Sequence, residues 1–164
     1  MEFSHLDEDG RLQMVDVSGK PIAARRARAR GAIYLQQATL DAITENKIAK
    51  GDVFAAARVA GIMAAKRCDE LIPLCHGLPL DRVSIDLEPK SDPPRVEISS
   101  HVTCTARTGA EMEALTAVSI AALTIYDMVK AMDRTAVIGD IRLVEKSGGK
   151  SGRFVREGDA CKEE

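Results

Sequence analysis

The sequence predicts an α+β protein of the ferredoxin-like, split βαβ class, in which helices pack on one face of an antiparallel sheet. The expected elements run strand, helices, strand, strand, helix, strand, which is the order of that fold. A pair of alternating segments in mid-chain predicts a hairpin, and a long apolar segment after it predicts the central helix. The 164 residues, 45% of them hydrophobic, are enough for one domain with a proper core.

Three segments are expected along the chain. Residues 1–20 have little core-forming pattern and are expected to form a flexible N-terminal arm, although residues 14–17 could be a short strand. Residues 21–154 form the single domain, and residues 155–164 are expected to be a disordered tail. The acidic start does not resemble a signal peptide, and the four dispersed cysteines favour a reducing compartment. A cytoplasmic protein is therefore expected.

The first part of the domain, residues 23–35, contains two different sequence patterns. Residues 23–30 alternate alanine and arginine, which is interpreted most simply as a solvated helix or arm, while residues 31–35 predict a strand. The arginines of residues 23–30 also suggest nucleic-acid binding as one alternative function. The net charge of −2 and the aromatic content of 3% argue against that alternative.

Two helices and a stiff loop are expected next. Thr39 could cap a short helix that runs to residue 46, and Asp52 could cap an alanine-rich helix over residues 53–67. Residues 71–80, with the sequence LIPLCHGLPL, interrupt the helical period. Because each proline fixes its own φ and restricts the residue before it, this segment is expected to be a constrained loop.

The second half of the domain begins with the hairpin. Residues 83–88 and 96–104 alternate apolar and polar side chains, and the proline-bounded residues 89–94 predict the turn between them. Residues 137–144 predict the last strand of the sheet.

Between the hairpin and the last strand, residues 108–133 predict one long helix. Glu111 and Glu113 lie at its start, where carboxylates suit the helix dipole, and residues 115–126 carry no charge, so the helix should be buried on most sides. It is too short and too rich in Ser and Thr to span a membrane. Glu113 and Asp127 share a face but lie about 21 Å apart. Either the two ends have different roles or, as we favour, a second subunit brings its own far end alongside.

Several residue patterns are compatible with chemistry, and each also has an ordinary structural explanation. His76 sits in the proline-bracketed loop, where it could bind a ligand or cap a neighbouring element. Asp127 and Lys130 could be a surface ion pair, or an acid/base pair with a partly desolvated lysine that donates protons near neutral pH. Lys50 precedes a predicted helix N-terminus, where it could contact phosphate or remain a solvated lysine.

A glycine-rich basic run follows the last predicted strand. Residues 146–153, KSGGKSGR, could wrap a phosphate with backbone donors, but the spacing of a Walker loop is absent and the run could simply be mobile. His5, His76 and His101 share no ligand spacing, and the cysteines are scattered. The sequence therefore predicts no metal site.

Several motifs taken together are similar to those of one known family. MVDVS, AKGDVFAAARVAGIMAAKR, LIPLCH, TGAEMEALTAVSIAALTIYDMVKA, VIG and RLVEKSGGKSG resemble the MoaC family of cyclic pyranopterin monophosphate synthases, from about Phe3 to Phe154. The resemblance implies a lyase of molybdenum cofactor biosynthesis that uses general acid/base catalysis. It would convert 3′,8-cyclo-7,8-dihydroguanosine 5′-triphosphate to cyclic pyranopterin monophosphate and release pyrophosphate. It also implies a homohexamer, a trimer of dimers, with active sites at the dimer interface.

The resemblance implies roles for residues in the matched motifs. The catalytic group would be Asp127, Lys130, Lys50 and His76, with Asp127 as the family's catalytic acid. The substrate-binding group would be Leu74, Cys75, His76, Met112 and Glu113, with Glu111 at the rim and Arg25, Lys146 and Lys150 on the triphosphate.

This sequence departs from the family pattern at two places. Gly77 stands where proline is common, and Ala106-Arg107 replaces the more usual Gly-Lys, which leaves loop stiffness and one cation contact open. The chemistry implies no resident cofactor, although Mg²⁺ could accompany the triphosphate. The alternative outside enzymology is a ligand-sensing or assembly module whose buried helix serves only to oligomerise.

Overall fold

The computed structural model describes residues 9–150 and 152–159. Within them the chain forms strands and helices in the predicted order. The elements are β1 (Ala23–Tyr34), α1 (Gln37–Thr44), α2 (Val53–Ala65), α3 (Cys68–Leu71), β2 (Leu80–Ser91), β3 (Pro94–Ala106), α4 (Glu111–Val129), β4 (Val137–Ser147) and β5 (Phe154–Val155).

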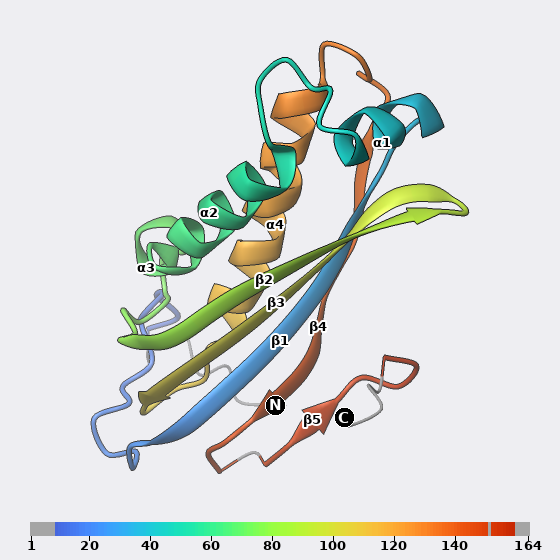
Figure 1. Cartoon of the computed structure of the whole chain (residues 1–164). Helices are drawn as coiled ribbons and strands as arrows, with labels where there is room; N and C mark the ends of the chain where they lie inside the picture. The colour runs from blue at the N-terminus through green and yellow to red at the C-terminus, as the bar shows by residue number, and fades with distance from the viewer. Residues whose placement is uncertain (1–8, 151, 160–164) are drawn as a thin grey trace.

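The sheet has the strand order β2-β3-β1-β4-β5, and every neighbouring pair is antiparallel. Its first four strands have the order and directions of the split βαβ, ferredoxin-like fold. Helices α2 and α4 lie side by side against one face of the sheet (Figure 1). The predicted α+β class is therefore confirmed.

Strand β1 corrects the interpretation of residues 23–30 as a solvated helix or arm. The segment is the first two thirds of one continuous strand. Ala27 and Ala29 are buried toward the helices, whereas Arg26 and Arg28, in the alternate positions, lie on the other face. The alternation of alanine and arginine has period two, which is the period of a strand with one face on the core.

The hairpin and the capping of α2 are confirmed. β2 and β3 pair from Leu80 to Ser91, which extends beyond the predicted residues, and the Asp52 carboxylate accepts a hydrogen bond of 2.9 Å from the Ala55 amide. Thr39 was wrongly expected to be a cap, because α1 begins two residues earlier and Thr39 is buried within it.

Both ends of the described chain differ from expectation. Residues 14–17 form no strand. After β4, the short strand β5 pairs with Glu145 and Lys146, and the Asp159 carboxylate lies 2.7 Å from Arg142 Nε. Residues 155–159, assigned from the sequence to the tail, therefore contact the sheet, while residues 1–8 and 160–164 lie outside the described residues. The division into arm, domain and tail stays a prediction.

Close packing between α2 and α4 depends on small side chains. Ala117 and Ala121 of α4 are fully buried, and Gly61 of α2 lies directly against them. A Cβ atom at Gly61 would lie 2.8 Å from the Ala117 carbonyl oxygen and 2.2 Å from Ile85 Cδ1. Such contacts are too short without movement of the backbone, so Gly61 sets the distance between the two helices.

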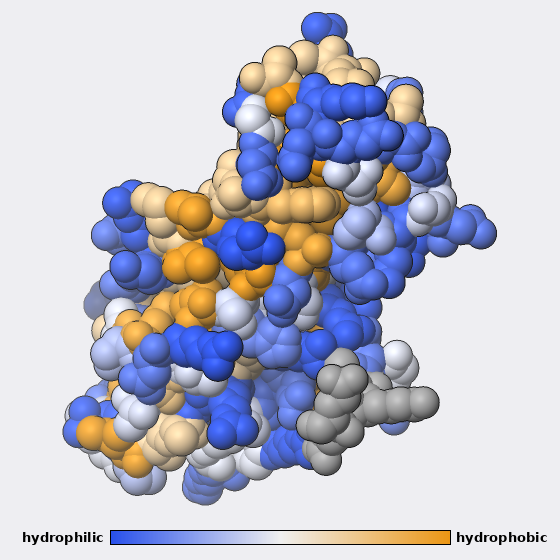
Figure 2. Space-filling model, viewed as in Figure 1, coloured by the Kyte–Doolittle hydropathy of each residue, from blue (hydrophilic) through white to orange (hydrophobic). Residues whose placement is uncertain are grey.

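The outward faces of the same helices remain apolar. Leu123 of α4 is 54% exposed, and Val59 and Met63 of α2 are also exposed. Figure 2 shows that apolar side chains gather over α2 and α4. Helix α4 is apolar and long enough to cross a membrane, but half of its most apolar stretch is buried within the domain, as in the core helix of a globular protein. One chain thus covers only one side of α4.

We predict that Gly61→Ala lowers the free energy of unfolding by about 1–2 kcal/mol. Overpacking costs about 1–3 kcal/mol, and the gain in helix propensity of up to about 1 kcal/mol offsets only part of it. Thermal denaturation would measure the effect, with Gly19→Ala as the control because a Cβ atom at Gly19 would have no neighbour within 4 Å. Equal stability of the Gly61→Ala variant and the wild type would refute this packing argument.

Candidate active site

A strongly basic pocket lies where β1 begins, β4 ends and α4 begins. Its volume is about 710 Å³, and its only acidic lining residue within the described chain is Glu111. The pocket is thus suited to an anionic ligand larger than a single phosphate. Its positively charged lining residues are Lys20, Arg25, Arg26, Arg107, Lys146 and Lys150.

Arg25 is the buried anchor of this pocket. It occupies an inward position of β1 and is only 8% exposed. Its Nε donates to the Ala106 carbonyl at 3.2 Å, and its Nη2 donates to the Arg107 carbonyl at 3.0 Å. These bonds to the end of β3 hold the guanidinium in one place, so its charge is fixed in the pocket wall.

The turn after β4 passes directly over Arg25. Gly148 and Gly149 have φ of +98° and +79°, in the left-handed region that glycine adopts most easily. A Cβ atom at Gly149 would lie 1.6 Å from Arg25 Nη1, so no side chain fits there. The glycines of the predicted basic run therefore allow close approach of the backbone to the arginine.

Lys146 and Glu111 join β4 to the first turn of α4. Lys146 Nζ lies 2.7 Å from Glu111 Oε1, and both side chains are partly buried. Because α4 begins at Glu111, the positive end of its dipole also faces this region. The sequence placed Arg25, Glu111, Lys146 and Lys150 in one site, and all four line this pocket.

His76 lies beside the basic pocket in a smaller cavity of about 250 Å³. Arg107 and Thr108 line both cavities, so the constrained loop and the basic pocket are neighbours. Arg107 thus retains a cation at the position where the family resemblance left one contact open. Lys20, Arg26 and Thr108 also line the basic pocket, although their sequence patterns predicted no role for them in the same site as Arg25.

Next to His76, a buried cluster forms from three segments of the chain. Cys75 Sγ lies 3.9 Å from Glu113 Oε1 and 4.0 Å from Cys68 Sγ. The ligand atoms of these three side chains all lie within 4.8 Å of one another. The sequence spacing gave no sign of this cluster, because its residues come from separate segments of the chain.

Glu113 is the most deeply buried acidic group in the site. It is 1% exposed, and its Oε2 atom has no hydrogen-bond partner within the described chain. Burial raises the pKa of Glu113 to about 7, with further contributions from the nearby carboxylates of Glu111 and Asp69. Burial also raises the pKa of Cys75, to about 12. The pKa of this carboxyl group therefore lies near neutral pH, although Glu113 itself lines neither cavity.

Three of the four predicted catalytic residues, Asp127, Lys130 and Lys50, gather at the opposite end of α4, whereas the fourth, His76, lies beside the basic pocket. Asp127 Oδ1 lies 2.6 Å from Lys130 Nζ, and Asp127 Oδ2 lies 2.9 Å from Lys50 Nζ. Hydrogen bonds from the two lysines lower the pKa of Asp127 to about 2, and Asp127 in turn raises the pKa of Lys130. The sequence left open whether this pair is a surface ion pair or an acid/base pair with a partly desolvated lysine. In the single chain Lys130 is exposed and its charged form is favoured, as in a surface ion pair.

One chain does not bring the predicted site residues together. Glu113 and Asp127 are about 21 Å apart along the helix axis, so the two ends form separate groups. Leu74 is half-buried in the loop beside Cys75, and Met112 is exposed on α4 next to Glu113. A site that includes both ends of α4 would need a second copy of the chain.

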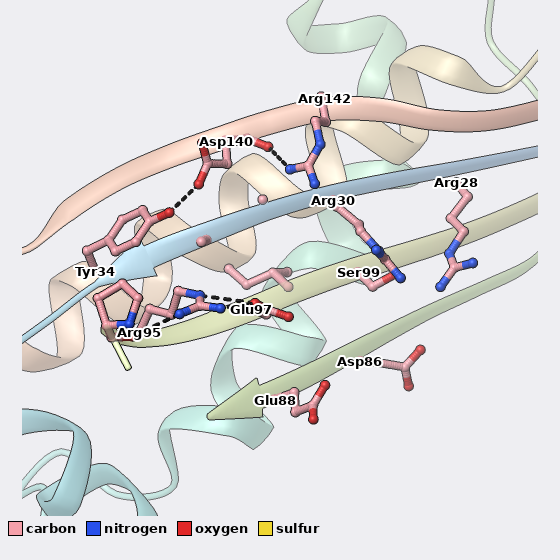
Figure 3. Close-up of a pocket in the computed structure, with 14 residues that line it drawn as sticks. Arg28, Arg30, Tyr34, Asp86, Glu88, Arg95, Glu97, Ser99, Asp140 and Arg142 are labelled. Carbon is pink, nitrogen blue, oxygen red and sulfur yellow. Dashed lines mark hydrogen bonds and ion pairs between the residues drawn. The ribbon is translucent and has the colours of Figure 1, made fainter. Parts of the chain in front are cut away.

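The outer face of the sheet carries another cavity, of about 480 Å³, shown in Figure 3. None of the residues predicted for the site lines it. Its acidic and basic side chains are equal in number and several are paired, for example Arg95 with Glu97 at 2.6 Å. Because its charges compensate one another, it lacks the excess positive charge of the basic pocket, and we place the candidate site at the latter.

A ferredoxin-like domain with a basic pocket beside a histidine and a buried carboxylate defines a protein that binds an anionic small molecule and can exchange protons with it. The particular family follows from comparison with known proteins. The family model described as "MoaC family" matches residues 14–149, so the chain belongs to the MoaC family.

Curated relatives match the chain over nearly its whole length. It is 58% identical to "Cyclic pyranopterin monophosphate synthase 3" of Mycobacterium tuberculosis (strain ATCC 25618 / H37Rv), over 94% of this chain and 86% of the relative. It is 56% identical to "Cyclic pyranopterin monophosphate synthase" of Desulfitobacterium hafniense, over 96% of each chain. The protein of that name from Thermomicrobium roseum is 54% identical over 98% of this chain and 97% of its own length.

We predict that Gly149→Ala weakens binding of inorganic pyrophosphate by about tenfold or more. The left-handed backbone costs a non-glycine residue about 1–2 kcal/mol, and the added carbon must displace the Arg25 guanidinium. Isothermal titration calorimetry would measure the affinity. Gly152→Ala is the matched control, since its φ is also positive but the space around it is open. Equal losses in both variants would contradict a specific contact with Arg25.

A second prediction concerns pH. Because the pKa of Glu113 is raised from 4.5 to about 7 on folding, protonation of Glu113 contributes stability that is complete below pH 4.5 and lost as pH rises to about 7. Glu113→Gln stays neutral, so the variant should gain stability relative to the wild type over this range, by up to about 3 kcal/mol. Denaturant unfolding at several pH values in metal-free buffer measures the difference. Exposed Glu70→Gln is the control, and a pH-independent difference for Glu113→Gln would contradict the prediction.

Proposed function

We propose that this chain is a cyclic pyranopterin monophosphate synthase, as its curated relatives are named. It would convert 3′,8-cyclo-7,8-dihydroguanosine 5′-triphosphate to cyclic pyranopterin monophosphate and pyrophosphate in molybdenum cofactor biosynthesis. This proposal places the chain among the phosphorus–oxygen lyases.

The observation that carries the proposal is the basic pocket around Arg25. A substrate triphosphate needs several fixed positive charges, and the pocket supplies six cationic side chains against one carboxylate. Arg25, Lys146 and Lys150 would neutralise the charge that develops on the departing pyrophosphate. The adjacent cavity, lined by His76, would hold the purine-derived part of the substrate. The family resemblance assigns Leu74, Cys75, Met112 and Glu113 to the same part of the substrate, although none of them lines this cavity in the single chain.

The proton transfers are assigned to the group at the other end of α4. Asp127 would orient Lys50 and Lys130, to which it is paired at 2.9 and 2.6 Å, and these lysines would donate and accept protons at the ring. In the single chain both lysines are exposed and Lys130 is strongly protonated. Burial by substrate and a neighbouring subunit would oppose the raised pKa of Lys130 and make proton donation from it easier.

These roles require a dimer in which each active site combines the start of α4 from one subunit with the end of α4 from the other. The exposed apolar side chains of α2 and α4, including Val59, Met63 and Leu123, support such a pairing because one chain leaves them uncovered. An antiparallel arrangement of two α4 helices would place the Glu113 end of one beside the Asp127 end of the other. The homohexamer, as a trimer of such dimers, belongs to the same proposal.

The proposed chemistry uses proton transfer and charge neutralisation and needs no resident redox cofactor. Assays with and without Mg²⁺ would determine whether the ion accompanies the triphosphate. A cytoplasmic location is proposed with this function. The alternatives of a ligand-binding module and of a nucleic-acid-binding protein predict no covalent change in the substrate.

The direct test is to mix the purified protein with the cyclic dihydroguanosine triphosphate and follow pyrophosphate release and product mass. Release of pyrophosphate together with a cyclic-phosphate pterin supports the synthase. Unchanged substrate in the presence of a folded, oligomeric protein would overturn it and favour the binding module.

We predict that Lys130→Ala reduces kcat/KM by at least about 10²-fold without unfolding the protein. Loss of a general acid/base group typically removes a factor of about 10² to 10⁴. Steady-state kinetics and circular dichroism measure the two properties. Lys90→Ala is the control, since Lys90 lies in β2 within the hairpin, pairs with Glu88 and is outside the predicted catalytic group. A Lys130→Ala variant with kcat/KM near that of the wild type would remove Lys130 from the catalytic group.

A further inference from the structure

The cluster of Cys68, Cys75 and Glu113 has the composition of a metal site. Cys68 is the first residue of α3, Cys75 belongs to the constrained loop, and Glu113 lies in the first turn of α4. Three separate segments thus bring two thiols and one carboxylate to a single point, with all ligand atoms within 4.8 Å of one another.

The distances within the cluster fit a tetrahedral ion. With metal–sulfur bonds of about 2.3 Å, two thiolate ligands at the tetrahedral angle are about 3.8 Å apart. The two sulfur atoms here are 4.0 Å apart, and Cys75 Sγ is 3.9 Å from Glu113 Oε1. The third pair, Cys68 Sγ and the Glu113 carboxylate, lies within 4.8 Å, so side-chain movements of up to about 1 Å would bring all three ligands to bonding distance of one ion.

Glu113 gives independent support for a cation. Its Oε2 atom is buried and has no hydrogen-bond partner within the described chain. Buried polar atoms without partners are rare in folded proteins because desolvation of such an atom costs free energy. A cation bound at this carboxylate would offset that cost.

We propose that Cys68, Cys75 and Glu113 form a site for a thiophilic divalent metal ion of the Zn²⁺ class. Two sulfur ligands favour Zn²⁺ over the hard ions Mg²⁺ and Ca²⁺. Binding would release the two thiol protons to solvent, since thiolates are the ligands. Cys75 is only partly buried, so the ion can enter from its side, and the fourth position is left for water.

The site has a consequence that rests on the proposed function. Cys75 and Glu113 are also proposed substrate contacts, so the ion and the substrate would compete for them. Zn²⁺ would then inhibit turnover, and substrate would protect against it. Metal binding itself does not depend on the identity of the substrate.

The experiment is titration of the metal-free, reduced protein with Co²⁺ as a spectroscopic probe and then with Zn²⁺ in competition. Cys161 is replaced by serine so that the cysteines in the tested protein are Cys68, Cys75 and Cys104. We expect one ion per chain, thiolate-to-cobalt charge-transfer absorption and the visible bands of tetrahedral Co²⁺. Cys68→Ser and Glu113→Gln should weaken binding by about tenfold or more.

Cys104→Ala is the matched control, because Cys104 is buried like Cys68 but lies outside the cluster. Circular dichroism and thermal unfolding of each apo variant ensure that lost binding reflects lost ligands. Absence of thiolate-to-cobalt absorption in the folded protein, or equal affinity in Cys68→Ser and Cys104→Ala, would overturn the metal site.

Competition is measured separately, as displacement of Co²⁺ by the cyclic triphosphate. Displacement supports the shared use of Cys75 and Glu113. Failure of substrate to displace a bound ion would overturn only the competition, whereas failure of the enzymatic assay with intact cobalt binding would count against the proposed function alone.

Discussion

The structure depends on the burial of one side of α4. Ala114, Ala117, Ala121 and Ala122 are fully buried there, and their small side chains let the helix approach the sheet and α2 closely. This packing fixes both ends of a rigid, 19-residue rod. The first turn is held beside Lys146 at the end of β4, and the last turn beside the loop that carries Lys50. The two chemical groups of the molecule are therefore kept apart by the same helix that positions them.

The two ends of α4 differ in charge and in burial. The basic pocket gathers cations around Arg25, whose own hydrogen bonds to β3 fix it in the wall, so the charges are in place before a ligand arrives. Beside it, burial disfavours the anionic form of Glu113 and raises the pKa of this carboxyl group to about 7. At the far end, Asp127 and its two lysines are exposed to solvent and held in ion pairs. They need a partner surface to become an enclosed catalytic group.

Local rules predicted much of this fold because the pattern of each element agrees with its place in the sheet. The hairpin, the Asp52 cap and the long helix all follow from period, caps and turn residues. Residues 23–30 were misread because alanine is depleted in strands and arginine is common in helices, yet their period of two was that of a strand. Strand β5 has two residues and carries no period at all.

The candidate site was less accessible to local reasoning. The contact between Lys50 and Asp127 joins positions 77 residues apart, and spacing cannot predict it. Family resemblance grouped Lys50 with Asp127 and Arg25 with Lys146, and the structure brings each of these pairs to its own end of α4. Family resemblance also grouped Cys75 with Glu113, but neither motifs nor resemblance predicted that Cys68 joins them, because the cluster forms only when α3, the loop and α4 pack together.

The most direct test of a site shared between two copies is complementation between two inactive variants. Lys146→Ala alters the basic pocket and Lys130→Ala the opposite end of α4, so a mixed dimer would contain one intact site and one doubly altered site. After co-expression with two affinity tags, random pairing should restore about a quarter of wild-type activity, since half of the dimers are mixed and half of their sites are intact. Activity no higher than that of either variant alone would contradict the shared site and place both groups in separate roles.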